Sequence, residues 1–264
     1  MDAVNAPQIG IVVPTLGTRP DYLNQALRSI RRAGNCHIVV VAPEPETIRS
    51  NYSPDLIDQI VQDPMSGLAE AINTGMRSLP SSVQYVNWLG DDDLLSPDSL
   101  AIASQILKNS PNLVCVYGGC SYIGPDGEVL WINKSGNYAK WLMRIGPQLI
   151  PQPGSLFTLN AFRKVGELDS RYKWAFDLDL LLKFSQLGRI QYIPQILSSF
   201  RWHEGSLSVG GRHGSVKEAS KIRRQALPKQ VQLFSPLWEF FIQYVILVAG
   251  NLLSKKSRGL KILT

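Results

Sequence analysis

Three consecutive carboxylates, Asp91, Asp92 and Asp93, directly follow an apolar run at residues 83–89. A run of that length and composition is typical of a buried strand. Three negative charges at the end of such a strand are costly unless a cation offsets them. In open α/β sheets, ligands bind just beyond the carboxyl ends of the strands. Adjacent carboxylates suit Mg²⁺ or Mn²⁺, which bind carboxylate and phosphate oxygens together. The alternative is a helix cap before Ser96, but a cap needs only one carboxylate.

Strands and helices are predicted to alternate up to about residue 110. The apolar runs predict strands at 9–13, 37–41, 57–61 and 83–89, and helical periodicity predicts helices at 21–32, 67–79 and 97–108. Strands joined by helices in this way form a mostly parallel central sheet flanked by helices, the α/β class. Beyond residue 113 the sequence is richer in turns. There it predicts a hairpin around residues 124–127 and a helix at 174–187.

Composition places the chain among globular proteins, because 44% of its 264 residues are hydrophobic and 18% are charged. The three cysteines, Cys36, Cys115 and Cys120, lack the spacing of a zinc site or a disulfide framework. The first residues lack the basic and apolar regions of a secretory signal. We therefore expect a reduced, cytoplasmic setting.

The positive charge is concentrated in the C-terminal part. Residues 201–264 hold 11 Lys/Arg and 3 Asp/Glu, a balance of +8 within a chain whose net charge is +6. An apolar segment at 233–253 has basic flanks, which is typical of a helix lying on an anionic membrane surface. The alternative is a helix packed on the rest of the protein. We expect a basic, amphipathic helical tail at 211–264 after a domain at 1–210. Aromatic residues do not alternate with the basic ones as at a nucleic-acid stacking site, so no nucleic-acid partner is expected.

Six segments together resemble the family 2 glycosyltransferases, which have the nucleotide-diphospho-sugar transferase (GT-A) fold. They are spread over residues 8–208, in the order expected for that family. The segments are 11–15, an opening strand with its Pro-Thr turn; 67–75, a helix beside the nucleotide; 89–93, the place of the metal-binding Asp-x-Asp; 165–169, a turn before the acceptor-side helix; 176–180, an acidic pair; and 200–208, a closing loop.

The resemblance implies a donor half at about 1–112, an acceptor half at about 113–210, and roles for particular residues. Asp92 would bind the divalent metal directly, Asp91 would hold the ribose or a metal-bound water, and His203 would be a further metal ligand. Asp177 would be the catalytic base, although a helix N-terminal acid is the alternative. The other residues expected to contact the nucleotide-sugar are Pro14, Thr15, Glu44, Asp63, Gly67, Asn73 and Arg201, of which Arg201 would steady the diphosphate.

Two departures from the family pattern affect the donor site. Many members follow the second strand with Asp-Asp-Gly-Ser, whose first acids touch the base and ribose. Here Ala42 and Pro43 precede Glu44, so that contact is either missing or replaced by Glu44. The base could thus be uridine, thymidine or guanosine. Asp63, after the third predicted strand, is either a contact to that base or a turn residue. The usual first acid of the metal motif aligns with Gly90, which leaves Asp91 and Asp92 as the pair.

The function predicted from these residues is a metal-dependent, inverting glycosyltransferase. It would use Mn²⁺ or Mg²⁺ and transfer a sugar from a nucleotide-diphospho-sugar to a hydroxyl of a glycan or lipid-linked glycan acceptor. Its setting would be the cytoplasm or, peripherally, the inner face of the cell membrane. Two alternatives stay open: a metal-dependent phosphohydrolase or nucleotidyltransferase with the same carboxylates, and a non-catalytic module that binds nucleotide-sugars or carbohydrate.

Overall fold

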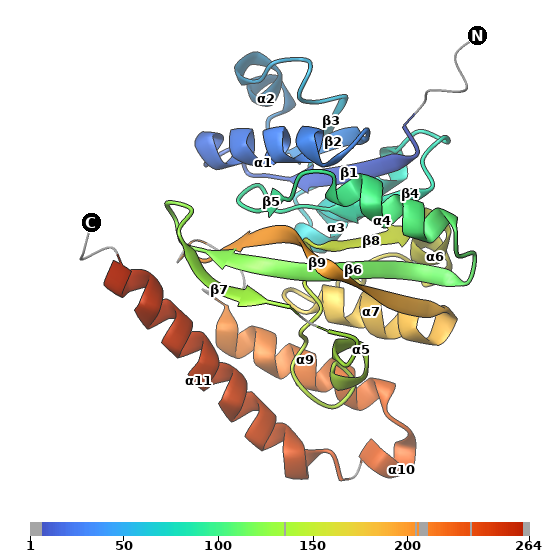
Figure 1. Ribbon diagram of the computed structural model, residues 1–264, viewed down its shortest axis with the longest axis vertical. Coiled ribbons are helices and arrows are strands. Elements are labelled where there is room, and N and C mark those ends of the chain that lie inside the picture. Colours follow the sequence, from blue (N-terminus) through green and yellow to red (C-terminus); the bar gives the residue numbers. More distant parts are fainter. Residues whose placement is uncertain (1–6, 135, 204, 206–210, 233, 261–264) are drawn as a thin grey trace.

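A computed structural model describes residues 7–134, 136–203, 205, 211–232 and 234–260 (Figure 1). One mixed sheet forms its centre, with helices on both faces and two long helices at the C-terminal end. The strands are β1 (Ile9–Pro14), β2 (His37–Ala42), β3 (Gln59–Gln62), β4 (Tyr85–Trp88), β5 (Leu94–Leu95), β6 (Leu113–Ile123), β7 (Val129–Asn133), β8 (Ser155–Thr158) and β9 (Arg189–Arg201). The helices that pack on the sheet or join its strands are α1 (Pro20–Ala33), α2 (Pro45–Asn51), α3 (Leu68–Ser78), α4 (Ser99–Lys108), α5 (Ala139–Leu142), α6 (Leu159–Lys164) and α7 (Phe176–Leu187).

The sheet has the strand order β3-β2-β1-β4-β8-β6-β9-β5, and β7 pairs with β6. The first four strands are parallel, as the alternation of strands and helices predicted. Beyond β4 the sheet is mixed, because β8 runs antiparallel to both β4 and β6 while β6 and β9 are parallel. The predicted α/β fold with a central sheet and C-terminal helices is confirmed, with parallel pairing dominant in the first half only.

Both faces of the sheet are buried, which explains the uninterrupted apolar runs of its strands. Successive residues of β1 belong to different cores: Ile11 and Val13 pack with α1 and α4, and Val12 packs with α3 and the helices of the second half. Helix α3 lies very close to the sheet at Gly75, where a Cβ would stand 2.5 Å from a methyl carbon of Val12. A larger side chain at Gly75 would push α3 away from β1.

The C-terminal part is helical, with α9 (Arg212–Ala226), α10 (Lys229–Gln232) and α11 (Pro236–Leu260). Helix α9 packs on α7, and α11 packs on α9 and touches β7. Among the helices of the described residues, none combines the length and the apolar character needed to cross a membrane. The predicted boundary after residue 210 falls at the end of residues 206–210, outside the described residues, and stays a prediction.

Candidate active site

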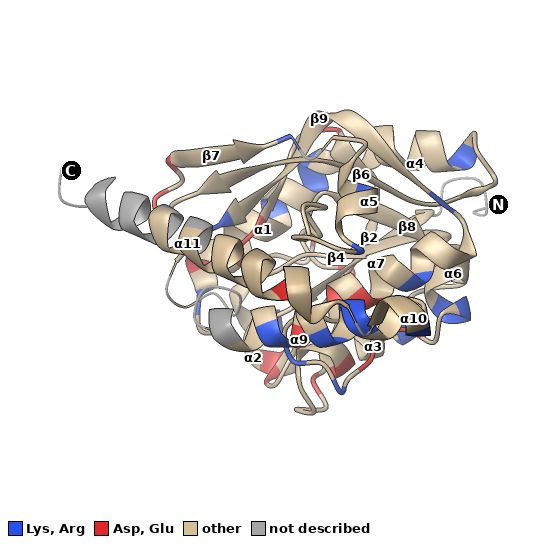
Figure 2. Ribbon diagram, turned by 90° about the horizontal axis from the view of Figure 1, so that it is seen from below, with Lys and Arg blue, Asp and Glu red and all other residues tan. Residues whose placement is uncertain are grey.

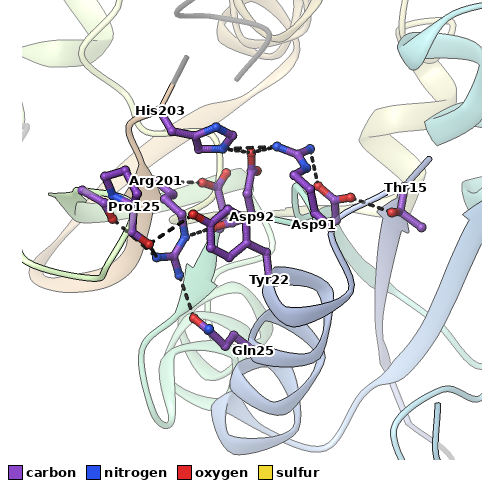
Figure 3. A network of polar contacts seen from close by, with 11 residues as sticks. Thr15, Tyr22, Gln25, Asp91, Asp92, Pro125, Arg201 and His203 are labelled. Atoms are coloured by element: carbon purple, nitrogen blue, oxygen red, sulfur yellow. Dashed lines mark hydrogen bonds and ion pairs between the residues drawn. The ribbon is translucent and has the colours of Figure 1, made fainter. Parts of the chain in front are cut away.

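The acidic loop meets the loop after β1 because β1 and β4 are parallel neighbours, with Val12 paired to Trp88. Parallel strands end at the same edge of the sheet, so the segments that follow them converge there. Thr15 and Arg19 come from the first loop, and Asp91 and Asp92 from the second (Figure 3). His203, just beyond the end of β9, approaches from the other half of the sheet.

Asp91 is buried and bound on both oxygens. Its side chain is 3% exposed, the Thr15 hydroxyl donates a hydrogen bond of 2.5 Å to Oδ2, and Arg19 Nη2 donates one of 2.6 Å to Oδ1. Burial raises the pKa of Asp91 above its usual value, and the Thr15 hydrogen bond and the Arg19 charge offset only part of that rise. Asp91 is therefore fixed in place by the loop after β1.

Asp92 faces two cationic or potentially cationic groups. Its Oδ2 lies 2.7 Å from Arg19 Nη1 and 2.8 Å from His203 Nε2, and these two nitrogens are 3.2 Å apart. Burial works to raise the pKa of Asp92, but the hydrogen bond from His203 and the charge of Arg19 outweigh it and lower the pKa. Asp92 is thus kept in its ionised form.

The side-chain atoms of Asp92 and His203 are suitable ligands for a divalent cation, but the guanidinium of Arg19 occupies the place beside them. Asp92 and His203 present a hard oxygen and an imidazole nitrogen to one point, which suits Mn²⁺. The guanidinium of Arg19 lies between Asp91 and Asp92 and supplies the positive charge there. Within the part of the chain that the structure describes, no group of three or more His, Cys, Asp or Glu side chains is arranged to hold a metal. Metal binding at Asp92 thus requires Arg19 to move aside.

Arg201 is buried behind the acidic loop and donates hydrogen bonds to two of its residues. It is 2% exposed, its backbone N–H donates to Asp93 Oδ1 at 2.9 Å, and its Nε donates to the Asp92 carbonyl oxygen at 2.9 Å. Its other nitrogens reach the Pro125 carbonyl at 2.8 Å and Gln25 on α1 at 2.9 Å (Figure 3). The sequence predicted a contact from Arg201 to the diphosphate. These contacts join β9, the β6–β7 turn and α1 around the site, and a contact of Arg201 with the diphosphate stays a prediction.

Asn73 also has a structural set of contacts. This α3 residue is 2% exposed and exchanges two hydrogen bonds with the backbone of Leu168, from Nδ2 to the carbonyl oxygen at 2.9 Å and from the N–H to Oδ1 at 3.1 Å. The sequence predicted that Asn73 contacts the nucleotide. Its amide connects α3 to the turn that precedes α7, and its contact with a nucleotide stays a prediction.

The remaining predicted donor contacts lie along the same edge of the sheet. Pro14 ends β1, Glu44 follows β2 and is exposed, and Asp63 follows β3 with its N–H bonded to the Ala42 carbonyl at 2.9 Å. Asp63 Oδ1 accepts a hydrogen bond of 2.8 Å from the N–H of Met65, two residues further on, and this bond shapes a turn. Gly67 begins α3 with a φ of 99°, a conformation that suits glycine. Their contact with a nucleotide stays a prediction.

Asp177 is held by residues from the second half of the chain. It is the second residue of α7, and its two oxygens accept hydrogen bonds from Gln148 Nε2 at 2.9 Å and the Leu178 N–H at 2.8 Å. Burial raises the pKa of Asp177 despite these hydrogen bonds. Burial also raises the pKa of Tyr122, and the charges of Asp93 and Asp177 add to that rise.

Helix α9 fixes the start of α7. The Glu218 carboxylate accepts hydrogen bonds from the N–H groups of Lys173, Trp174 and Ala175 at 2.7–2.9 Å. A carboxylate at a helix N-terminus accepts hydrogen bonds from N–H groups that have no partner within the helix. Its negative charge is also attracted by the positive end of the helix dipole. The helical tail thus helps to position Asp177.

We did not predict from the sequence that Arg19, Gln148 or Glu218 belongs to the site. Arg19 could have been found, because the predicted order of parallel strands places the loop after the first strand beside the acidic loop. Gln148 and Glu218 lie in segments without a local signal, 29 and 41 residues from Asp177 along the chain. Residues 204 and 206–208 of the predicted closing loop lie outside the described residues.

Comparisons with known proteins relate the chain to glycosyltransferases. No protein-family model matches the chain. The chain is 26% identical over 264 residues to an uncharacterized glycosyltransferase of Rickettsia typhi, covering 93% of this chain and 76% of that protein. It is 23% identical over 186 residues to a chondroitin synthase of Pasteurella multocida, covering 70% of this chain. The match spans only 19% of that synthase's length.

Two solved structures share the fold. The mannosyltransferase PcManGT from Pyrobaculum calidifontis, in complex with GDP-Man and Mn²⁺, has a TM-score of 0.66 at 16% identity, covering 98% of this chain and 77% of that one. S. aureus TarS 1–349, in complex with UDP-GlcNAc, has a TM-score of 0.62 at 13% identity, covering 85% of this chain and 69% of that one. The fold is therefore the GT-A fold of nucleotide-sugar transferases. The resemblance of the sequence to glycosyltransferases is confirmed.

Proposed function

We propose that the protein is a metal-dependent, inverting glycosyltransferase that transfers a sugar from a nucleotide-diphospho-sugar to a hydroxyl of a glycan or lipid-linked glycan. The observation that carries this proposal is the cluster of Asp91, Asp92, Arg19 and His203 at the carboxyl edge of a parallel sheet. Carboxylates of this kind hold a divalent metal that offsets the charge of a nucleotide diphosphate, and the GT-A neighbours were solved with UDP-GlcNAc or with GDP-Man and Mn²⁺. The proposed setting is the cytoplasm, with peripheral attachment to the inner face of the cell membrane.

Asp92, with His203 beside it, would hold the divalent metal, and Asp91 would bind the ribose or a metal-bound water. Such a metal neutralises the charge that develops on the leaving diphosphate. Thr15 holds the Asp91 side chain and Arg201 holds the backbone at Asp92, so Arg19 is the group that has to move when the metal binds.

Asp177 would remove the proton from the acceptor hydroxyl. Gln148 and the Leu178 N–H hold its two oxygens, which fixes the orientation of the carboxylate. The raised pKa makes Asp177 a stronger base than an exposed aspartate. A single displacement by the activated hydroxyl inverts the anomeric carbon.

Neutralising Arg19 should make the fold depend on a divalent metal. In Arg19→Gln, Asp91 and Asp92 lose the charge that offsets their repulsion. Because Arg19 is one-third exposed, we expect a loss of only about 1–2 kcal/mol in the free energy of unfolding, measured in EDTA. Mn²⁺ should restore the loss and should bind the variant more tightly than the wild type. Thermal unfolding in EDTA and in Mn²⁺, with an EPR titration of Mn²⁺, measures both effects. An equal loss of Tm with and without Mn²⁺ would contradict the prediction.

The central test is a panel of nucleotide-sugars, with release of nucleoside diphosphate measured with Mn²⁺, with Mg²⁺ and with chelator. The proposal expects metal-dependent release from one donor, and the preferred donor identifies the base accepted near Glu44. Release of phosphate or pyrophosphate instead would show the phosphohydrolase or nucleotidyltransferase alternative. Donor binding by calorimetry without turnover, in the presence of a range of glycan acceptors, would show the binding module. Absence of both binding and release would overturn the proposal.

A further inference from the structure

Helix α11 turns its polar side toward the protein and its apolar side away from it. Glu239 is 4% exposed and accepts a hydrogen bond of 3.0 Å from Arg224 on α9. Gln243, one turn further along, donates a hydrogen bond of 3.0 Å from Nε2 to Ser220 Oγ, also on α9. A surface helix normally buries its apolar stripe in the core. Here these two polar residues of the helix face the domain, beside the partly buried Trp238 and Ile242.

The outward side of α11 carries an exposed apolar stripe. Leu237 and Phe240 are 80% and 79% exposed. The stripe continues at helical spacing, and its main members are Leu237, Phe240, Phe241, Tyr244, Val248 and Leu252. A contiguous row of large apolar side chains on the surface marks a site of interaction with another molecule or a membrane.

The charge around α11 favours an anionic partner. The segment from residue 201 carries 11 Lys/Arg and 3 Asp/Glu. Of these acids, Glu218 and Glu239 are directed inward, to backbone N–H groups at the start of α7 and to Arg224. Lys217, Lys221 and Lys229 remain exposed. Figure 2 shows basic residues along α9 and α10, beside α11.

A lipid leaflet fits this surface better than a second copy of the chain. Phenylalanine and tyrosine on one side of a basic helix are typical of a helix that lies in the headgroup region of a membrane. A paired helix would instead present aliphatic residues at heptad positions. Two copies facing each other through this surface would also bring their positive charges together. We propose that the outward stripe of α11 lies in the headgroup region of an anionic leaflet.

This placement would orient the active site toward lipid-linked acceptors. Helix α11 contacts β7, whose hairpin turn supplies the Pro125 carbonyl that accepts from Tyr22 and Arg201 at the site. The hairpin of β6 and β7 thus connects α11, where the leaflet would bind, with the site. The preference for a lipid-linked acceptor rests on the proposed function, whereas the binding to the leaflet does not.

The test measures how the full chain binds to vesicles of phosphatidylcholine alone or of equal parts phosphatidylcholine and phosphatidylglycerol. We expect binding to the mixed vesicles only, weakened by salt because exposed charges are screened. The double variant Phe240→Ser/Phe241→Ser should lower the partition coefficient by more than about tenfold, since two large apolar side chains no longer enter the membrane. Met65→Ser, a change at an equally exposed apolar residue after β3, should have no effect.

Three outcomes would overturn the proposal: no binding to mixed vesicles, equal binding to pure phosphatidylcholine, or equal binding of the double variant. A wild-type dimer that the double variant converts to a monomer, without vesicle binding, would assign the stripe to a second copy. Circular dichroism and Tm verify that the variant folds. Release of nucleoside diphosphate to a water-soluble acceptor should equal that of the wild type. That measurement separates a failure of membrane binding from a failure of the proposed function.

Discussion

Asp177→Asn should lower kcat by about 10²–10⁴-fold, the usual contribution of a general base. The amide has nearly the shape of the carboxylate and can still accept the hydrogen bond from Gln148. It cannot take the proton of the acceptor hydroxyl. The donor site, on the loops after β1 and β4, is unchanged, so the Kd of the nucleotide-sugar should stay the same. Steady-state release of nucleoside diphosphate and calorimetry of donor binding measure the two effects.

The pH dependence of the wild type gives a second measurement of the same group. Because burial raises the pKa of Asp177, kcat should fall toward acid with a midpoint above the usual value for aspartate, and the variant should lose that limb. A raised pKa in the folded state means that any stabilisation by the protonated form is present at low pH and is lost as pH rises through that pKa. The neutral amide should therefore leave Tm at neutral pH nearly unchanged.

Asp179→Asn is the matched control, on the same helix two residues further on. Its carboxylate lies 2.7 Å from Lys183 in an i,i+4 pair, which contributes only about 0.3–0.5 kcal/mol. The kcat of Asp179→Asn should be close to that of the wild type. Comparable activity of Asp177→Asn and the wild type would remove Asp177 from the role of base.

The parallel half of the sheet could be predicted from the sequence because each of its elements has a local signal. Strands buried on both faces appear as continuous apolar runs, and the helices between them have helical periodicity. The mixed half lacks such signals. Strand β9 extends over Arg189–Arg201 with buried, partly buried and exposed residues in irregular order. Its pairing with β6 contains register shifts, which no sequence pattern indicates.

The roles of individual polar residues were harder to predict than their location near the site. Asn73 and Arg201 stand in segments that resemble the glycosyltransferase family, yet both are buried and bonded to protein groups. Their partners are distant in the sequence: Leu168 lies 95 residues from Asn73, and the Asp92 carbonyl lies 109 residues from Arg201. Arg19 also has a distant partner, since Asp91 lies 72 residues away, but here the predicted order of the parallel strands was enough to bring the two loops together.

The C-terminal helix combines the two alternatives that the sequence left open. Composition predicted either a helix on a membrane or a helix packed on the protein; α11 has one side that packs on α9 and an exposed apolar side for which we propose the membrane. The two polar residues that interrupted the apolar segment, Glu239 and Gln243, make the contacts with α9. The interruptions in an apolar pattern therefore located the packed side.

Asp92→Asn should lower kcat/KM for the donor by about 10³-fold, because a metal that neutralises a diphosphate contributes several kcal/mol. The amide keeps one acceptor oxygen for Arg19 but loses the negative charge that would bind Mn²⁺. An EPR titration should show weaker Mn²⁺ binding, and calorimetry should show weaker donor binding in Mn²⁺. The lowered pKa of Asp92 means that its ionised form stabilises the fold at neutral pH, so Tm should fall there. The fall should be small, because the charge of Asp92 also adds to the burial that raises the pKa of the buried Asp93.

Asp98→Asn is the control for this variant, at an exposed residue just beyond the acidic loop. Its φ of 58° is one that asparagine adopts readily, so the fold and the Mn²⁺ affinity should be unchanged. Unchanged Mn²⁺ affinity in Asp92→Asn would refute the assignment of the metal ligand. Together, the two active-site variants separate the halves of the reaction. Asp92→Asn should weaken metal and donor binding, whereas Asp177→Asn should leave both intact and slow only the transfer, because one carboxylate serves the leaving diphosphate and the other serves the incoming hydroxyl.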